Sequence, residues 1–223
     1  MGPIEFLLRD PAPPSRSLRR EMGSGGIEIA WFVGRSSSPI ATVSAGEIRI
    51  RDRKIVVARW EGGEEVFVGH EELFGQWGPE RALVIRSARQ PNAAMLVGQE
   101  GSELLKLDLE RPAVSRVAEL PRVNLEPDAG YHRLKAHLRG EMILLNWELG
   151  ILALDPSFEL RWRQDLVWNH RIVHLDDGEI WFDYFYDSED GSQQIGVEPY
   201  GFSVATGQQL FDRRPPDGAT EPA

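Results

Sequence analysis

The sequence predicts an all-β fold, and three observations support that prediction. Short runs of alternating apolar and polar residues, rich in β-branched and aromatic side chains, occupy much of the chain between residues 27 and 212. Gly, Asp, Asn or Pro separates most successive runs, as is typical of turns between strands. Helical periodicity is scarce, and residues 70–77 form the one stretch that favours a short helix or turn. Antiparallel sheets joined by tight turns follow from this pattern.

Individual strands are predicted where the alternation is clearest. Successive side chains of a strand point to opposite faces, so a half-buried strand shows apolar residues at every second position. The predicted strands are Ile27–Val33, Glu47–Arg51, Lys54–Trp60, Glu64–Gly69, Ala94–Gly98, Leu104–Asp108, Glu141–Trp147, Ile151–Asp155, Glu159–Arg163 and Glu179–Tyr186.

The chain also repeats one pattern. Met95 and Asp108 recur as Met142 and Asp155, each 47 residues later. A third copy begins at residues 179–186, which lie 38 residues after the corresponding run of the second copy. It continues at residues 200–207, now 50 residues after the second copy, so its two inner strands enclose a loop that is 50 − 38 = 12 residues longer. Residues 47–69 form a fourth, weaker copy.

Each copy is predicted to be a four-stranded antiparallel meander. One meander buries too little apolar surface to be stable alone, so such units stack on one another. Repeats of roughly 40–50 residues with four short strands are typical of propeller blades. We therefore expect a propeller-like array of four to five units or an open stack of sheets, with a β-sandwich as the alternative. In a closed ring, residues 27–33 would pair with the last unit.

Two stretches resemble a known kind of blade. Residues 151–162 read ILALDPSFELRW and residues 201–211 read GFSVATGQQLF. They resemble quinoprotein-type (PQQ-like) β-propeller repeats, whose blades end in Ala-x-Asp-x-x-Thr-Gly-x-x-x-Trp. The matching positions are Ala153, Asp155 and Trp162 in one copy and Thr206, Gly207 and Phe211 in the other. The first copy lacks Thr-Gly, and the second has Ala205 in place of Asp.

The resemblance implies a propeller without its cofactor. Quinone enzymes of this type are longer and place a pair of adjacent cysteines against the quinone ring, whereas this chain has no cysteine. No cofactor is therefore expected. The motif residues have physical roles of their own: Asp155 can accept hydrogen bonds from turn amides, and Gly207 can take a positive φ. Trp162 and Phe211 are expected to cover the seam between neighbouring sheets.

Two histidines occur in a repeated context and are the first candidates for chemistry. His132 and His170 each precede Arg and an aliphatic residue, with Gly-Glu at the same distance downstream. With Asp176, Asp177 or Asp183 they could bind a divalent metal. In the other interpretation each histidine begins a strand and hydrogen-bonds to neighbouring backbone. The second interpretation is favoured, and no metal is assigned, because metal sites need three or four convergent ligands.

The long third-copy loop is the second candidate. Insertions on a rigid β scaffold often carry binding, and residues 183–198 combine acids with aromatic side chains. The aromatic residues could bind a partner, or they could pack between sheets. The predicted binding residues are His132, Trp168, His170, Asp183, Tyr184, Tyr186 and Asp187.

Composition excludes several classes of function. With no cysteine there is no disulfide framework, thiolate metal site or cysteine nucleophile. The formal net charge of −10 disfavours nucleic-acid binding. No run approaches the roughly 18 apolar residues of a membrane span, and the first residues do not read as a signal peptide. A cytoplasmic protein without membrane or nucleic-acid partners is expected.

These observations predict one all-β domain with a binding role. Residues 1–26 are expected to form a partly flexible arm, residues 27–212 the repeat domain and residues 213–223 a flexible tail. The predicted function is a non-catalytic binding or protein-interaction module for a protein or small-molecule ligand. The alternative is a small metal- or carboxylate-dependent hydrolase or lyase that uses the His132/His170 face. A third hypothesis is a bacterial immunity or defence accessory protein with a basic toxin partner.

Overall fold

A computed structural model describes most of the central part of the chain. The described residues are 20–22, 26–33, 39–51, 54–61, 63–66, 81–98, 103–108, 110, 113–121, 134–166, 170–187, 193–195 and 199–210. Every extended regular element within them is a β-strand, which confirms the predicted all-β class. They contain no helix long and apolar enough to span a membrane. The possible helix at residues 70–77 lies outside the described residues.

The chain divides into two compact units. Unit 1 comprises residues 1–121 and 156–158, and unit 2 comprises residues 122–155 and 159–223. Each unit contains two antiparallel sheets, so the described residues form four sheets rather than the two of a β-sandwich. The single domain expected over residues 27–212 stays a prediction.

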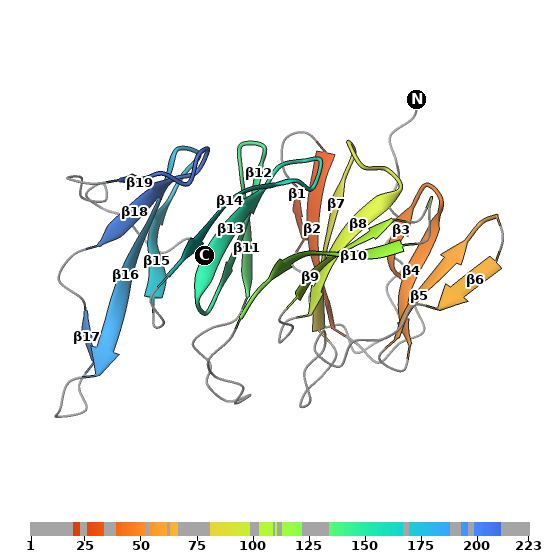
Figure 1. Cartoon of the computed structure of the whole chain (residues 1–223), viewed down its shortest axis with the longest axis horizontal. Coiled ribbons are helices and arrows are strands. Elements are labelled where there is room, and N and C mark those ends of the chain that lie inside the picture. The colour runs from red at the N-terminus through yellow and green to blue at the C-terminus, as the bar shows by residue number, and fades with distance from the viewer. Residues whose placement is uncertain are drawn as a thin grey trace. The chain divides into compact units, whose positions relative to one another are not determined.

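Unit 1 contains a four-stranded meander and a six-stranded sheet (Figure 1). The meander, which confirms the weak fourth copy, consists of β3 (Pro39–Val43), β4 (Gly46–Arg51), β5 (Lys54–Arg59) and β6 (Gly63–Val66). The six-stranded sheet has the order β1-β2-β7-β8-β9-β10. Its strands are β1 (Arg20–Met22), β2 (Ile27–Val33), β7 (Arg81–Ser87), β8 (Ala93–Gly98), β9 (Glu103–Asp108) and β10 (Ala113–Glu119).

The pairing of β2 corrects one prediction. This strand was expected to pair with the last unit, but it pairs along its whole length with β7, from Ile27 opposite Ser87 to Val33 opposite Arg81. A buried ion pair accounts for this register, because Glu28 lies directly opposite Arg86 and accepts a hydrogen bond from its guanidinium. A buried carboxylate needs such a partner, and β7 supplies one.

Unit 2 contains two sheets that follow the predicted meander closely. The first has the order β11-β12-β13-β14, and the second has the order β15-β16-β18-β19, with β17 paired to β16 beside this path. The strands of the first sheet are β11 (Lys135–Arg139), β12 (Met142–Trp147), β13 (Gly150–Leu154) and β14 (Leu160–Asp165). Those of the second are β15 (His170–Leu175), β16 (Glu179–Asp187), β17 (Gln193–Ile195), β18 (Tyr200–Ser203) and β19 (Gln209–Leu210).

An apolar core fills the space between the two sheets of unit 2, which Figure 1 shows side by side in green and blue. Each sheet contributes the side chains of one face, and fully burying one large apolar side chain stabilises the fold by roughly 1.5–3 kcal/mol. The core residues are Leu144, Ile151, Ala153, Trp162, Leu166, Ile172, Ile180, Phe182, Phe202 and Val204.

The repeated residues lie on equivalent strands, with one shift. Met95 and Met142 both lie on the second strand of their meanders, β8 and β12. Lys106 pairs with Met95, yet Ala153, which is 47 residues beyond Lys106, pairs with Leu144. The shift of two residues arises because β8 and β9 are joined by residues 99–102, whereas β12 and β13 are joined by residues 148–149 alone. An even shift keeps the same side chains on the core face.

The motif residues near the seam perform the expected roles. Trp162 is buried, and its indole Nε1 donates to the backbone oxygen of Val204 at 2.8 Å, so it spans the two sheets. Gly207 has a φ of +69°, and a Cβ there would lie 2.6 Å from the Trp162 ring. Asp155 accepts from the Glu159 amide at 3.0 Å and caps the β13–β14 turn. Phe211 lies outside the described residues.

Candidate functional site

The structure describes only part of the predicted binding face. His170 and Asp183 are described with their side chains. Tyr184, Tyr186 and Asp187 lie on β16, where the backbone alone is described, and His132 and Trp168 lie outside the described residues.

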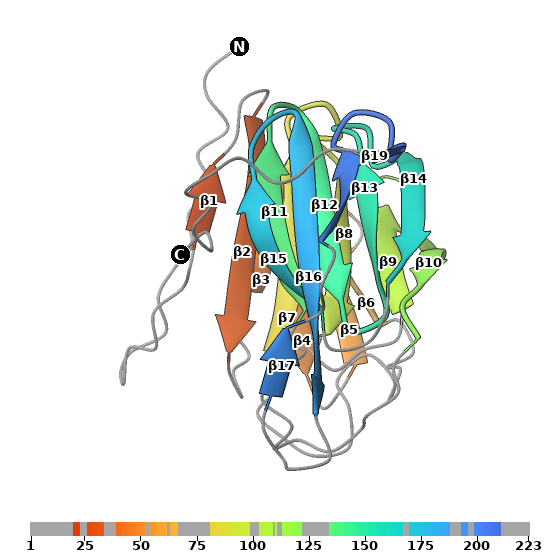
Figure 2. The same ribbon diagram turned by 90° about the vertical axis from the view of Figure 1, so that its left-hand side faces the viewer.

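The predicted insertion includes a short hairpin that extends the last sheet. The first four residues of β16, Glu179–Phe182, pair with β18. The last three, Phe185–Asp187, pair instead with β17. Figure 2 shows β17 beside the lower end of β16, away from β18 and β19. The extra residues of the third copy therefore lengthen β16 and place a second ladder beyond the sheet.

His170 is a buried residue at the seam between the two sheets of unit 2. It begins β15, and only 7% of its surface is exposed. Its Nε2 lies 2.8 Å from Nδ2 of Asn146 on β12. Its ring meets Phe182 edge-on, with the ring centroids 5.3 Å apart. This position agrees with the interpretation that the histidine begins a strand, although its partner is a side chain of the neighbouring sheet.

The orientation of Asn146 determines which nitrogen of His170 carries the proton. Nδ2 of Asn146 also donates to the backbone oxygen of Gly150 at 2.9 Å, which identifies it as the amide nitrogen. An amide nitrogen only donates, so Nε2 of His170 must accept. The imidazole is therefore neutral, with its proton on Nδ1.

Asp183 is committed to an ion pair on the other face of the sheet. It is buried, and Arg171 donates to it from two nitrogens, Nε to Oδ1 at 2.8 Å and Nη2 to Oδ2 at 2.9 Å. Arg171 is directly opposite Asp183 in the ladder and follows His170 in sequence. Because neighbouring side chains of a strand alternate between faces, His170 and Asp183 point away from each other and do not share a metal ion.

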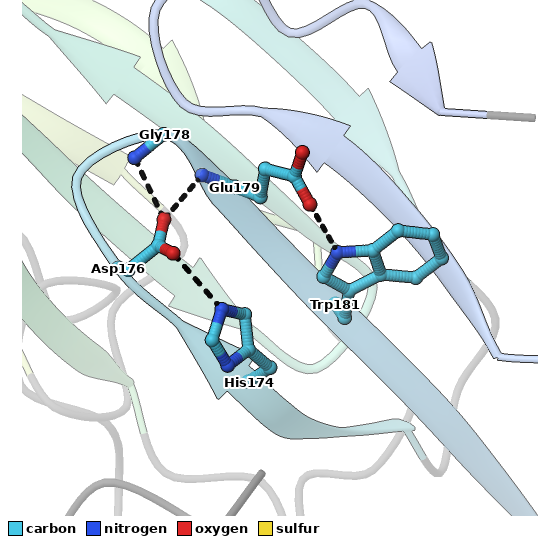
Figure 3. Close-up of polar contacts among 5 residues, drawn as sticks. All are labelled: His174, Asp176, Gly178, Glu179 and Trp181. Carbon is cyan, nitrogen blue, oxygen red and sulfur yellow. Dashed lines mark hydrogen bonds and ion pairs between the residues drawn. The ribbon is translucent and has the colours of Figure 1, made fainter. Parts of the chain in front are cut away.

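The acids of the β15–β16 turn also have structural partners (Figure 3). Oδ1 of Asp176 accepts from the amides of Gly178 and Glu179, each at 2.7 Å, and Oδ2 lies 3.1 Å from Nε2 of His174. Partial desolvation raises the pKa of Asp176, but the two amides and His174 outweigh it and hold the pKa below the ordinary value of 3.8. Asp176 thus stays ionised and closes the turn.

Two further contacts complete this turn. Trp181 donates from Nε1 to Oε2 of Glu179 at 2.9 Å, and Oδ1 of Asp177 accepts from the amide of Gly140 in the β11–β12 turn at 3.0 Å. Within the described ranges, no group of three or more His, Asp or Glu residues is arranged to hold a metal ion.

The strand registers do not keep the expected equivalence of the two histidines. Tyr184, 38 residues after Asn146, pairs with His170, whereas Asn146 itself pairs with Lys135. Lys135 therefore occupies the ladder position of His170, three residues beyond His132. The β15–β16 connection is longer than the β11–β12 turn by two residues, and a bulge in β15 adds the third.

Sequence reasoning missed the residues that hold His170 and Asp183 in place. Asn146 is a lone polar residue in the apolar run MILLNW, and such a residue signals a buried hydrogen bond. Arg171 follows His170 directly, but only the ladder places it opposite Asp183.

These features define a β-repeat protein whose described blades are antiparallel meanders. No protein-family model matches the sequence, and no curated protein matches it. Among solved structures, the chain is similar to the Neurospora crassa Pan2 WD40 domain, with 13% sequence identity and a TM-score of 0.31. The alignment covers 83% of this chain and 59% of that domain, so the chain spans less than two thirds of its length.

Proposed function

We propose that the chain is a non-catalytic binding module whose contact surface is centred on the β16–β17 hairpin. The observation that carries this proposal is the second ladder, Phe185–Asp187 with Gln193–Ile195, added beyond the four-stranded sheet. A rigid sheet that extends one strand beyond its neighbours is a common support for a recognition surface. The acid and imidazole of this sheet, Asp183 and His170, are meanwhile bound to Arg171 and Asn146.

The proposed surface draws on residues beside the hairpin. Tyr184, Tyr186 and Asp187 belong to β16, and Trp168 and His132 complete the predicted set. Aromatic side chains bury a large area at low conformational cost, so they suit a protein or small-molecule partner. The net charge of −10 favours a neutral or basic partner in the cytoplasm over nucleic acid or a membrane surface.

The repeats are further proposed to be degenerate relatives of quinoprotein-type blades without the quinone site. Support comes from Asp155, Trp162 and Gly207, which occupy a turn, a seam and a positive-φ position as that motif requires.

The binding role is tested by two matched variants of the full chain. Tyr186→Thr with Asp187→Lys alters the hairpin and keeps its β propensity. Leu160→Thr alters an exposed residue of β14 in the same unit and serves as the control. A partner is first enriched from source cells by cross-linking to the wild type, then purified and titrated calorimetrically. We expect the hairpin variant to lose about tenfold or more in affinity, as for an aromatic hot spot. Equal affinity of all three proteins would contradict the proposal.

The same preparations distinguish the alternative enzyme. A hydrolase or lyase on the His132/His170 face predicts a stoichiometric transition metal that His132→Ala with His170→Ala removes. The binding role predicts no such metal in either protein, measured by elemental analysis after purification without chelators.

A further inference from the structure

We propose that the Asn146–His170 hydrogen bond is a pH-sensitive tie between the two sheets of unit 2. Protonation of His170 would release one end of their seam while the other end stays closed. This inference goes beyond the binding role and stands independently of it, because it rests on contacts inside unit 2 alone.

The seam has polar ties at both ends, and they differ in chemistry. At the end formed by the β15–β16 and β18–β19 turns, Trp162 donates to Val204 and Gln164 donates to the backbone oxygen of Gly207 at 2.9 Å. The amide of Gly140 donates to Asp177 at the same end. An indole, a side-chain amide and a carboxylate do not change protonation state near neutral pH. At the opposite end, where β15 begins, the tie is an imidazole.

Protonation would reverse the role of His170 in its hydrogen bond. The neutral ring accepts at Nε2 from the amide nitrogen of Asn146, which donates to Gly150 as well. A charged imidazolium has donors on both nitrogens and no acceptor. Two donors would then face each other across a buried seam, and a buried donor without an acceptor is costly.

The surroundings of His170 set the sign of the effect. Its described neighbours are Asn146 on β12 and the ring of Phe182 on β16, on which Tyr200 of β18 stacks. The Asp183 carboxylate points to the opposite face of the sheet and is held by Arg171 on β15, whose positive charge opposes a second cation nearby. Glu148 is buried in the turn that follows β12 and is the acid whose position could favour the charged ring.

Glu148 therefore has to be separated from Asn146 experimentally. If the Asn146 contact governs His170, the seam loosens as the pH falls. If the Glu148 carboxylate governs it, the seam tightens instead, and this opposite sign would overturn the proposal.

Hydrogen–deuterium exchange on the full chain tests the tie at about pH 7.5 and about pH 5.5, on either side of the ordinary histidine pKa. After correction for the intrinsic rate, we expect exchange in residues 144–151 to rise by about tenfold or more at the lower pH, since breaking a buried bond costs more than 1 kcal/mol. Residues 176–180, at the other end of the seam, should change little. Equal protection of residues 144–151 at both pH values would overturn the proposal.

Two histidines on one strand provide a matched control. In His170→Gln the amide oxygen can still accept from Asn146 and does not titrate, so the pH dependence of residues 144–151 should disappear. In His174→Gln, which alters the exposed turn, it should remain. A pH dependence that survives in His170→Gln would overturn the proposal. If that variant does not fold, ¹⁵N shifts of the wild-type imidazole decide, because a proton on Nε2 at neutral pH contradicts the tie.

Discussion

The two ends of the β15–β16 hairpin use histidine in opposite ways. At the turn end, His174 contacts Asp176 two residues away, and Asp176 binds the amides of Gly178 and Glu179. At the other end, His170 contacts Asn146, which is 24 residues away on another sheet. The first arrangement is local and largely exposed, whereas the second is tertiary and buried. The comparison teaches that a repeated sequence context does not assign a role, because burial and partner decide it.

The largest expected effect comes from removing the ring that supports His170. Phe182 is fully buried, so Phe182→Ala leaves a cavity between the two sheets of unit 2. The free energy of unfolding should fall by about 3–5 kcal/mol, measured by chemical denaturation. Phe182→Leu, which keeps most of the volume, should cost clearly less. A loss below about 1 kcal/mol for the alanine variant would show that this end of the hairpin is not the packed one.

An intermediate effect is expected from Asn146→Ala. The change removes the donor to both His170 and the backbone oxygen of Gly150 and leaves two buried acceptors. Unfolding free energy should fall by roughly 1–3 kcal/mol. His174→Ala, which breaks the exposed contact with Asp176, should cost less than about 1 kcal/mol in the same assay. Equal losses in the two variants would remove the distinction between a tertiary and a local histidine.

The smallest effect is a pH dependence at the turn end. The pKa of Asp176 is lowered on folding, so its contribution to stability is present above the unfolded value and is lost as pH falls through the folded one. Asp176→Asn should therefore lower stability slightly at neutral pH and flatten the acid-side decline below about pH 4. Unfolding curves at several pH values measure both. An unchanged slope would show that the amides of Gly178 and Glu179 do not favour the carboxylate.

Strands whose faces differ in polarity were predictable, and the others were not. β2 was predicted with its observed bounds, Ile27–Val33. β7 was missed because it is paired on both sides, and residues 83–87 are all buried, so alternation is absent. β10 was missed for the opposite reason, since it is an edge strand with mostly exposed or half-exposed residues. The bulge in β15 breaks its alternation as well.

The candidate site was predictable in its location and less so in its contacts. Counting residues between copies located the insertion, and a hairpin now lies within it, between β16 and β17. The equivalence of His132 and His170 failed because turn length and a bulge moved the register by three residues.

The sequence by itself determined the local features of this protein: alternating strands, the turns at Asp155 and Gly207, and the repetition of a four-stranded unit. These depend on residues close together in the chain, whose preferences act over a few bonds. Only the tertiary structure decided that β2 joins β7, that Arg171 faces Asp183 and that His170 meets Asn146. Such partners depend on strand register, which one extra turn residue or bulge shifts while the surrounding sequence pattern stays the same.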